Sequence, residues 1–206
     1  MRAKQVLGMF VAMAVLACGT MSAAQDVTTL PIREEQQLYE IMAEFINNGP
    51  ANHQFGYLAD IAGLSSVFSS TTTKDESTAL FTYVVDAQNF QVVTHGAFRI
   101  TDRVGTCTIY LNNGPSDFNN PASFSQGTPI QVSTYRQTVV VRLADNTFVS
   151  TNTHAITKVE TFSLNGVNYR LGQFGKSFRS TYSGVVGLNQ PPLVTGFFAG
   201  TAVGMK

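Results

Sequence analysis

The sequence predicts a mainly β protein, most simply an antiparallel up-and-down β-barrel, with a β-sandwich as the alternative. From Phe55 onward, short runs rich in Val, Ile, Thr, Phe and Tyr alternate with clusters of Gly, Asn, Pro and Ser, a pattern typical of strands joined by turns. The connections are hairpin-like, which favours a barrel because closure removes exposed strand edges. The 15 Phe and 7 Tyr residues, with no Trp, can fill such a core.

The first 24 residues predict a secretory signal peptide. Arg2 and Lys4 precede an apolar run over 6–17, and small residues lead to Ala24, as expected for a cleaved signal. The run is shorter than a membrane-spanning helix. A less favoured interpretation is acylation at Cys18, which would leave the protein anchored to a membrane. We therefore expect an extracytoplasmic protein, either periplasmic or secreted.

After this signal we expect a flexible lead-in over 25–32 and a single β-rich domain over 33–206. The domain is expected to begin with an amphipathic helix over 33–46. Two acidic residues suit the positive end of the helix dipole in its first turn, and an Asn-Asn-Gly-Pro sequence supplies a stop. One apolar stripe recurs at three- and four-residue steps, formed by Leu38, Ile41, Met42, Phe45 and Ile46.

Strands follow the helix in nine expected segments. The long ones can each hold a bend or bulge. The segments are 55–69, 79–85, 90–101, 106–112, 130–143, 147–164, 167–173, 177–186 and 193–203.

Two turns are predicted directly from residue type. Asn165-Gly166 is the strongest two-residue hairpin signal, and a hairpin there pairs Phe162 with Tyr169 and places both on one face. A second turn is expected over 144–146. Residues 113–127 form a long polar loop, whose Phe118 and Phe124 indicate that it folds back onto the body of the domain. Loops of this length are usually functional or disordered.

Composition excludes several classes of function. Cleavage after Ala24 leaves 11 basic and 13 acidic residues, so the chain lacks the basic surface that nucleic-acid binding needs. Outside the signal no apolar stretch is long enough for a transmembrane span. Cys107 would stand alone, so no intramolecular disulfide can form. The absence of any Asn-x-Ser/Thr sequence favours a bacterial source.

No catalytic, metal or cofactor site follows from the motifs. There is no Gly-x-Ser-x-Gly sequence, and Cys107 shares the parity of apolar neighbours, which predicts a buried thiol. His53, His95 and His154 show no metal-ligand spacing. A site assembled in space from His95 and His154 is left open.

The most suggestive pair is His95 with Arg99. In an unbroken strand over 90–101, a period of two places these side chains on the same face. If that face lines the lumen, they would bind the carboxylate or phosphate of a ligand, because arginine offers a planar fork of donors. If it faces water they are ordinary surface residues, and this interpretation is favoured because antiparallel sheets are commonly solvated on one side.

The C-terminal segment 196–204 alternates Gly with apolar residues, which suits a bend or close backbone approach in a last barrel strand. It resembles the small secreted barrels of the lipocalin and allene-oxide-cyclase-like kind. The resemblance covers this segment alone and implies no functional residue.

Three functions remain open. The first is a non-catalytic barrel that binds a small, mostly apolar ligand, with an enclosed cavity of several hundred Å³. The second is a cell-surface or matrix interaction protein with a filled core and an exposed apolar patch. The third is a barrel-lumen enzyme of the cyclase or isomerase type that uses His95 or Arg99.

Overall fold

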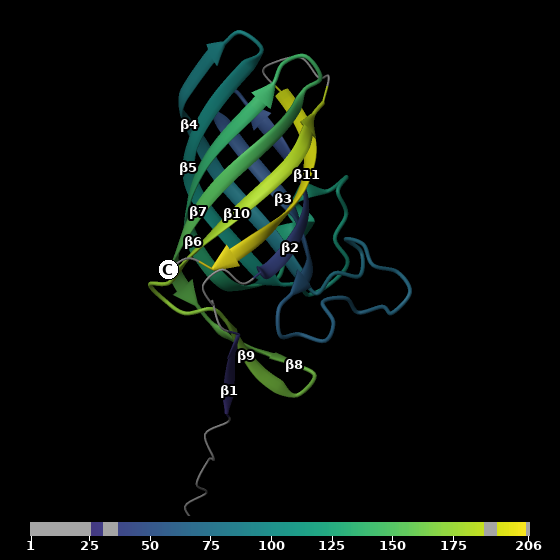
Figure 1. Cartoon of the computed structure of the whole chain (residues 1–206). Helices are drawn as coiled ribbons and strands as arrows, with labels where there is room; N and C mark the ends of the chain where they lie inside the picture. The colour runs from purple at the N-terminus through teal and green to yellow at the C-terminus, as the bar shows by residue number, and fades with distance from the viewer. Residues whose placement is uncertain (1–25, 31–36, 188–192, 205–206) are drawn as a thin grey trace, which may run out of the picture.

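The computed structural model describes residues 26–30, 37–187 and 193–204. Eight strands close into an antiparallel barrel in the order β10–β11–β2–β3–β4–β5–β6–β7, which confirms the predicted barrel (Figure 1). Three shorter strands, β1, β8 and β9, form a separate sheet. The strands are β1 (Val27–Leu30), β2 (Gln37–Asn48), β3 (Ala51–Ile61), β4 (Phe81–His95), β5 (Phe98–Leu111), β6 (Thr128–Arg142), β7 (Thr147–Val159), β8 (Thr161–Leu164), β9 (Val167–Leu171), β10 (Ser177–Val186) and β11 (Leu193–Gly204).

The barrel is defined by alternation along each strand. In β6, Tyr135 and Gln137 are buried in the lumen, whereas Thr134 and Arg136 are exposed. Successive side chains of a strand point to opposite faces, so one parity fills the lumen and the other meets solvent. Many of the side chains that fill the lumen are polar. Hydropathy alone therefore does not distinguish these buried positions from exposed ones.

Glycines in β10 and β11 make room for large rings in the lumen. A Cβ on Gly196 would lie 2.6 Å from the Phe45 ring, and one on Gly184 would lie 2.6 Å from the Phe148 ring. Glycine therefore permits close approach there, which confirms the expectation for Gly196 in the last strand.

The helix expected over 33–46 is wrong from residue 37 onward, and residues 33–36 lie outside the described part of the chain. Residues 37–48 form β2, which pairs with β3 on one side and β11 on the other. Tyr39, Ile41 and Phe45 point into the core. The same apolar residues satisfy both a helical and a strand period, and the pairing with two neighbouring strands decides between them.

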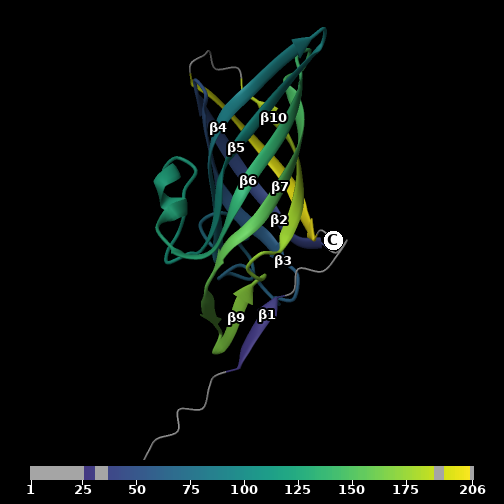
Figure 2. The same ribbon diagram turned by 90° about the vertical axis from the view of Figure 1, so that its left-hand side faces the viewer.

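The strand expected over 90–101 is a hairpin. β4 ends at His95 and β5 begins at Phe98, with Gly96 between them at a φ of +56°. His95 pairs with Phe98 across this turn. The β4–β5 hairpin extends beyond its neighbours at one end of the barrel (Figure 2).

Two other long segments are also interrupted. The predicted strand 55–69 ends at Ile61, where β3 finishes, and irregular chain follows as far as β4. The segment 147–164 divides into β7 and β8 at Glu160, with a register shift where β7 pairs with Val132 and Ser133. The predicted bend in 147–164 is therefore confirmed, because the shift turns Lys158 outward after the buried Ile156.

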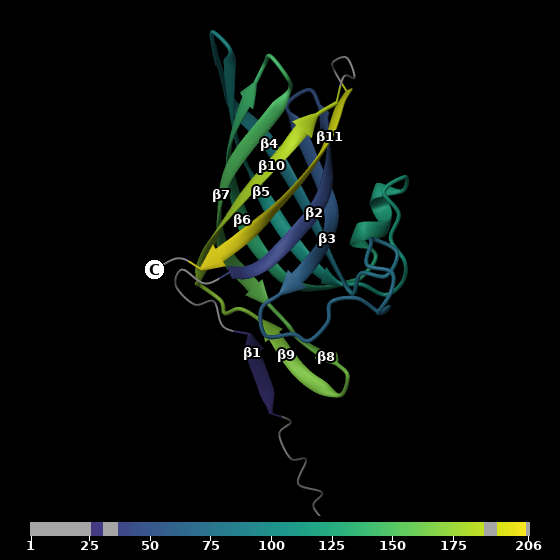
Figure 3. The same cartoon turned by 45° about the vertical axis from the view of Figure 1, so that its right-hand side comes forward.

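The small sheet covers one end of the barrel, which we call the closed end (Figure 3). The Asn165-Gly166 hairpin is confirmed, with Phe162 opposite Tyr169 as predicted. Asn165 and Gly166 have φ values of +52° and +78°, as a type I′ turn requires. β1 adds to this hairpin as a parallel strand on β9. The Phe162 ring contacts Phe81 of β4, with centroids 5.5 Å apart, so the sheet packs directly on the barrel.

The loop over 113–127 folds back onto the barrel wall, as predicted. It contains a short 3-10 helix, η1 (Pro121–Ser125), which lies against β3 and β4 (Figure 2). Phe124 is fully buried, and its ring lies 5.5 Å from Phe55. The loop therefore covers an apolar area on the outside of β3.

Candidate functional site

A pocket lies in the lumen near the end opposite the small sheet, which we call the open end. Its partly exposed lining residues, Asn47, Arg99 and Val186, lie near the strand ends there. The deeper wall combines buried polar side chains with apolar ones. The lining is Phe45, Asn47, Gln54, Arg99, Thr101, Arg103, Gln137, Val139, Val141, Phe148, Tyr182, Val186 and Phe198.

The cavity volume is about 40 Å³, far below the several hundred Å³ expected from the sequence for a ligand-binding barrel. Aromatic and amide side chains fill the rest of the lumen. A water molecule needs about 10–15 Å³ of such space, so the pocket has room for a few waters or for one small polar group. It does not enclose a whole ligand.

Arg103 lies at the bottom of this pocket and is only 9% exposed. Its guanidinium donates three hydrogen bonds to neutral amide oxygens: Nε to Asn89 Oδ1 at 2.7 Å, Nη1 to Gln137 Oε1 at 2.8 Å and Nη2 to Asn47 Oδ1 at 3.3 Å. Burial lowers the pKa of Arg103 to about 10, and the positive charge of Arg99 acts in the same direction. The group therefore remains a buried cation at neutral pH.

Arg99 lies above Arg103 on the same face of β5. Because β5 alternates, Arg99, Thr101 and Arg103 all point into the lumen. The Arg99 Nε atom is buried and has no hydrogen-bond partner. An unmet buried donor of this kind is costly, and a ligand acceptor in the pocket would satisfy it.

Neither arginine forms an ion pair within the described residues. The pairs found there are His53–Asp86, Arg142–Asp145 and Lys158–Glu160, and none of these lines the pocket. A buried charge is usually paired. The described lining of the pocket thus contains two arginines and no acidic residue.

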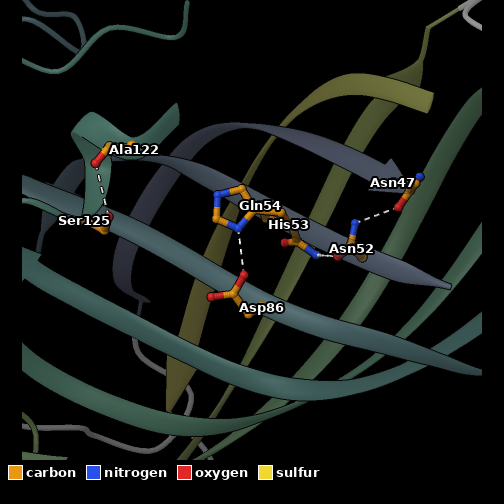
Figure 4. Close-up of polar contacts among 7 residues, drawn as sticks. All are labelled: Asn47, Asn52, His53, Gln54, Asp86, Ala122 and Ser125. Carbon is orange, nitrogen blue, oxygen red and sulfur yellow. Dashed lines mark hydrogen bonds and ion pairs between the residues drawn. The ribbon is translucent and has the colours of Figure 1, made fainter. Parts of the chain in front are cut away.

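A hydrogen-bond network connects Arg103 to the middle of the barrel. Asn47 Oδ1 accepts from Arg103 and also from Asn52 Nδ2, the latter at 2.8 Å. Gln54 Nε2 donates to Asn52 Oδ1 at 2.7 Å. Figure 4 shows Asn47, Asn52 and Gln54 joined in this way, while His53, between them in sequence, contacts Asp86. The alternation of β3 therefore places Asn52 and Gln54 in the lumen, where they donate to Asn47 and Gln137, two of the amides that accept from Arg103.

The network continues from Gln54 to His154. Tyr83 OH donates to Gln54 Oε1 at 3.1 Å and lies 3.2 Å from Tyr182 OH. Ser180 Oγ donates to Tyr182 OH at 2.9 Å and lies 3.0 Å from His154 Nε2. Burial raises the pKa of both phenols and lowers the pKa of His154 to about 3. These groups stay neutral at pH 7, so the network supplies oriented dipoles rather than charge.

The structure separates the two residues that the sequence placed together. Arg99 lines the pocket, whereas His95 is exposed at the tip of β4 and pairs with Phe98 on the outer face. The assignment of His95 and Arg99 to a common face is wrong because the turn at Gly96 and Ala97 lies between them. Alternation continues only within one strand.

The positions of Cys107, His95 and His154 decide the other sites considered from the sequence. Cys107 is buried in the lumen as predicted, and burial raises the pKa of its thiol to about 12. His154 is buried and His95 is exposed, so they do not meet. Within the described ranges no group of three or more His, Cys, Asp or Glu residues is placed to hold a metal ion. Nor does any described helix have the length and apolar character needed to cross a membrane.

The sequence interpretation missed Arg103 and the amides around it. The signal was present, because Arg103 shares the parity of Cys107 and Ile109 along β5, and Cys107 was expected to be buried. Asn52 and Gln54, which donate to two of these amides, carry no comparable signal, since they precede the first expected strand segment. Comparison with protein-family models, curated proteins and solved structures finds no match to this chain.

Proposed function

We propose that the chain is an exported barrel that binds a small amphiphilic ligand through an anionic group, without catalysing a reaction. The anionic group, most simply a carboxylate, enters the open end and is bound by Arg99 and Arg103. The apolar part of the ligand contacts Val141, Phe148 and Val186 at the mouth. Export rests on the signal-like N-terminal pattern.

The observation that carries this proposal is the pair of arginines without an acidic partner in the described residues. Three guanidinium donors of Arg103 are held by amides, which fixes the plane of the group. Such a preorganised fork suits a carboxylate, because two parallel N–H···O bonds can form. The small cavity supports entry of the head group alone, with the ligand body at the mouth.

The experiment is a calorimetric titration with octanoate, compared with octanol. We expect octanoate to bind and octanol to bind at least about tenfold more weakly, since a hydrogen bond to a charged group contributes about 1.5–3 kcal/mol. Arg99→Gln should weaken octanoate binding by about tenfold or more, and Arg103→Lys should do so as well, because it keeps the charge but loses the fork.

Arg136→Gln is the matched control. Arg136 lies on the outer face of β6, with its guanidinium 5.5 Å from the Phe90 ring centroid, so this variant should bind octanoate like the wild type. Equal affinity for octanoate and octanol would refute the proposal, as would unchanged binding by Arg99→Gln. Should Arg103→Lys fail to fold, the half-buried Arg99 still provides the test.

A further inference from the structure

The outer surface of the open end carries an apolar collar. Large apolar side chains there are between about a third and two thirds exposed, and they come from six neighbouring strands, β4 to β7, β10 and β11. We define the collar as Val93, Ile100, Val140, Val149, Val185 and Phe197.

The collar is nearly continuous from strand to strand. Val93 pairs with Ile100, Ile100 with Val140, and Val140 with Val149, so four strands contribute one uninterrupted row. Val185 pairs with Phe197 in the adjacent row. A depression on the outer face is lined by Val140, Val149 and Val185 of this collar. Apolar surface gathered in one zone indicates a contact site.

Positive charge at the open end lies at the mouth of the lumen. Asp145 is paired with Arg142, whereas Asp102 lies beside the collar and accepts a hydrogen bond from Thr138. Glu44, which pairs with Phe197, has its pKa raised mainly by partial burial, which disfavours its charged form. Arg99 is partly exposed at the mouth and has no acidic partner in the described residues.

The geometry points to a lipid surface as the partner: the barrel docks by its open end on a membrane that contains anionic lipids, from which the proposed ligand is taken. This step rests on the proposed function. The collar follows the curve of the barrel over six strands, so a second copy would cover only the strands on one side. A lipid interface can receive the whole end. Apolar side chains inserted at the interface and cations facing anionic head groups are the two contributions that hold proteins on such surfaces.

The experiment is co-flotation of the full chain with phosphatidylcholine vesicles, with and without phosphatidylglycerol. We expect binding that increases with phosphatidylglycerol. The double variant Val149→Thr, Phe197→Ser should bind about tenfold more weakly or worse, because two exposed apolar groups no longer enter the interface. Phe174→Ser is the matched control: Phe174 is 73% exposed but lies between β9 and β10, on the side of the small sheet, so binding should be unchanged.

Three outcomes would overturn the inference: no flotation of the wild type, an equal loss in Phe174→Ser, or a dimer in solution that the collar variant dissociates. Octanoate titration of the same variants separates the two proposals. A collar variant that binds octanoate but not vesicles supports both. Vesicle binding without octanoate binding would remove the lumen site and leave only the surface contact.

Discussion

At the closed end of the barrel the lumen is filled mainly with rings and aliphatic side chains, whereas at the open end two arginines and a group of amides lie among such side chains. Tyr39 and Phe178 contact each other edge to face at the closed end, with centroids 5.5 Å apart. At the open end, Arg103 is surrounded by amide oxygens, and Arg99 keeps an unpartnered donor. The difference indicates that packing at the closed end stabilises the fold, whereas the open end contributes less to the free energy of unfolding because it forms a binding site.

His154 marks the boundary between these two regions. Its ring stacks on Phe178, with centroids 4.1 Å apart, and its two nitrogens lie within hydrogen-bond distance of Ser133 and Ser180. The His154 side chain thus belongs both to the aromatic packing of the closed end and to the polar network that leads to the open end. The neutral imidazole suits both environments.

The largest effect is expected from truncating a ring at the closed end. Phe178→Ala should lower the free energy of unfolding by about 3–5 kcal/mol, because a fully buried ring leaves a cavity. Phe148→Ala should cost about 2 kcal/mol, since Phe148 lines the pocket and water can enter the space. Urea unfolding followed by circular dichroism measures both. Equal losses would mean that the two ends are packed alike.

The second effect is a pH dependence of stability caused by His154, at the boundary between the two ends. Burial lowers the pKa of His154 to about 3 in the folded protein, against roughly 6.5 in the unfolded chain. The unfolded state therefore binds the proton first as pH falls. As the pH falls from about 6.5 to about 3, protonation of His154 in the unfolded chain should lower the free energy of unfolding by roughly 1.4 kcal/mol for each pH unit.

The measurement compares urea unfolding of the wild type and His154→Gln across this pH range. Glutamine does not titrate, so the variant should lose less stability on acidification. Carboxylates shared by both proteins cancel in the difference. Parallel pH profiles would show that His154 is not held neutral at the boundary.

The smallest effect is expected at the open end and has the opposite sign. Arg99→Met should raise the free energy of unfolding of the unliganded protein by about 0.5–1 kcal/mol, because it removes an unmet buried donor and the repulsion with Arg103. Octanoate binding should be lost in the same variant. His95→Ala is the control: its free energy of unfolding should stay within about 0.5 kcal/mol of the wild type, and it should still bind octanoate. A destabilised Arg99→Met would show that Arg99 supports the fold.

Features determined by neighbouring residues were predictable from the sequence. Asn165-Gly166 specifies its own turn, so the pairing of Phe162 with Tyr169 followed without knowledge of the rest of the chain. The burial of Cys107 followed from its parity with Ile109. The antiparallel barrel itself followed from repeated short strands and hairpin-like connections.

Features determined by distant residues were not predictable in the same way. Ile41 and Phe45 fit a helix as well as a strand, and only the pairing of β2 with β11 selects the strand. Gly96 fits a continuous strand in the sequence, because its neighbours do not signal the left-handed conformation that it adopts. Arg103 resembles a surface residue until Asn47, Asn89 and Gln137 are brought around it from three other strands.

The pairing of β2 with β11 also has a consequence for how the chain folds. The strand that begins at Gln37 finds its second neighbour only in the segment Leu193–Gly204, so the cylinder cannot close before nearly the whole polypeptide is present. Contacts between such distant segments slow folding, since a long loop must be ordered before they form. Until then β2 and β11 each present an open edge on which other chains can pair. The chain is therefore most vulnerable to aggregation just before its last strand is in place.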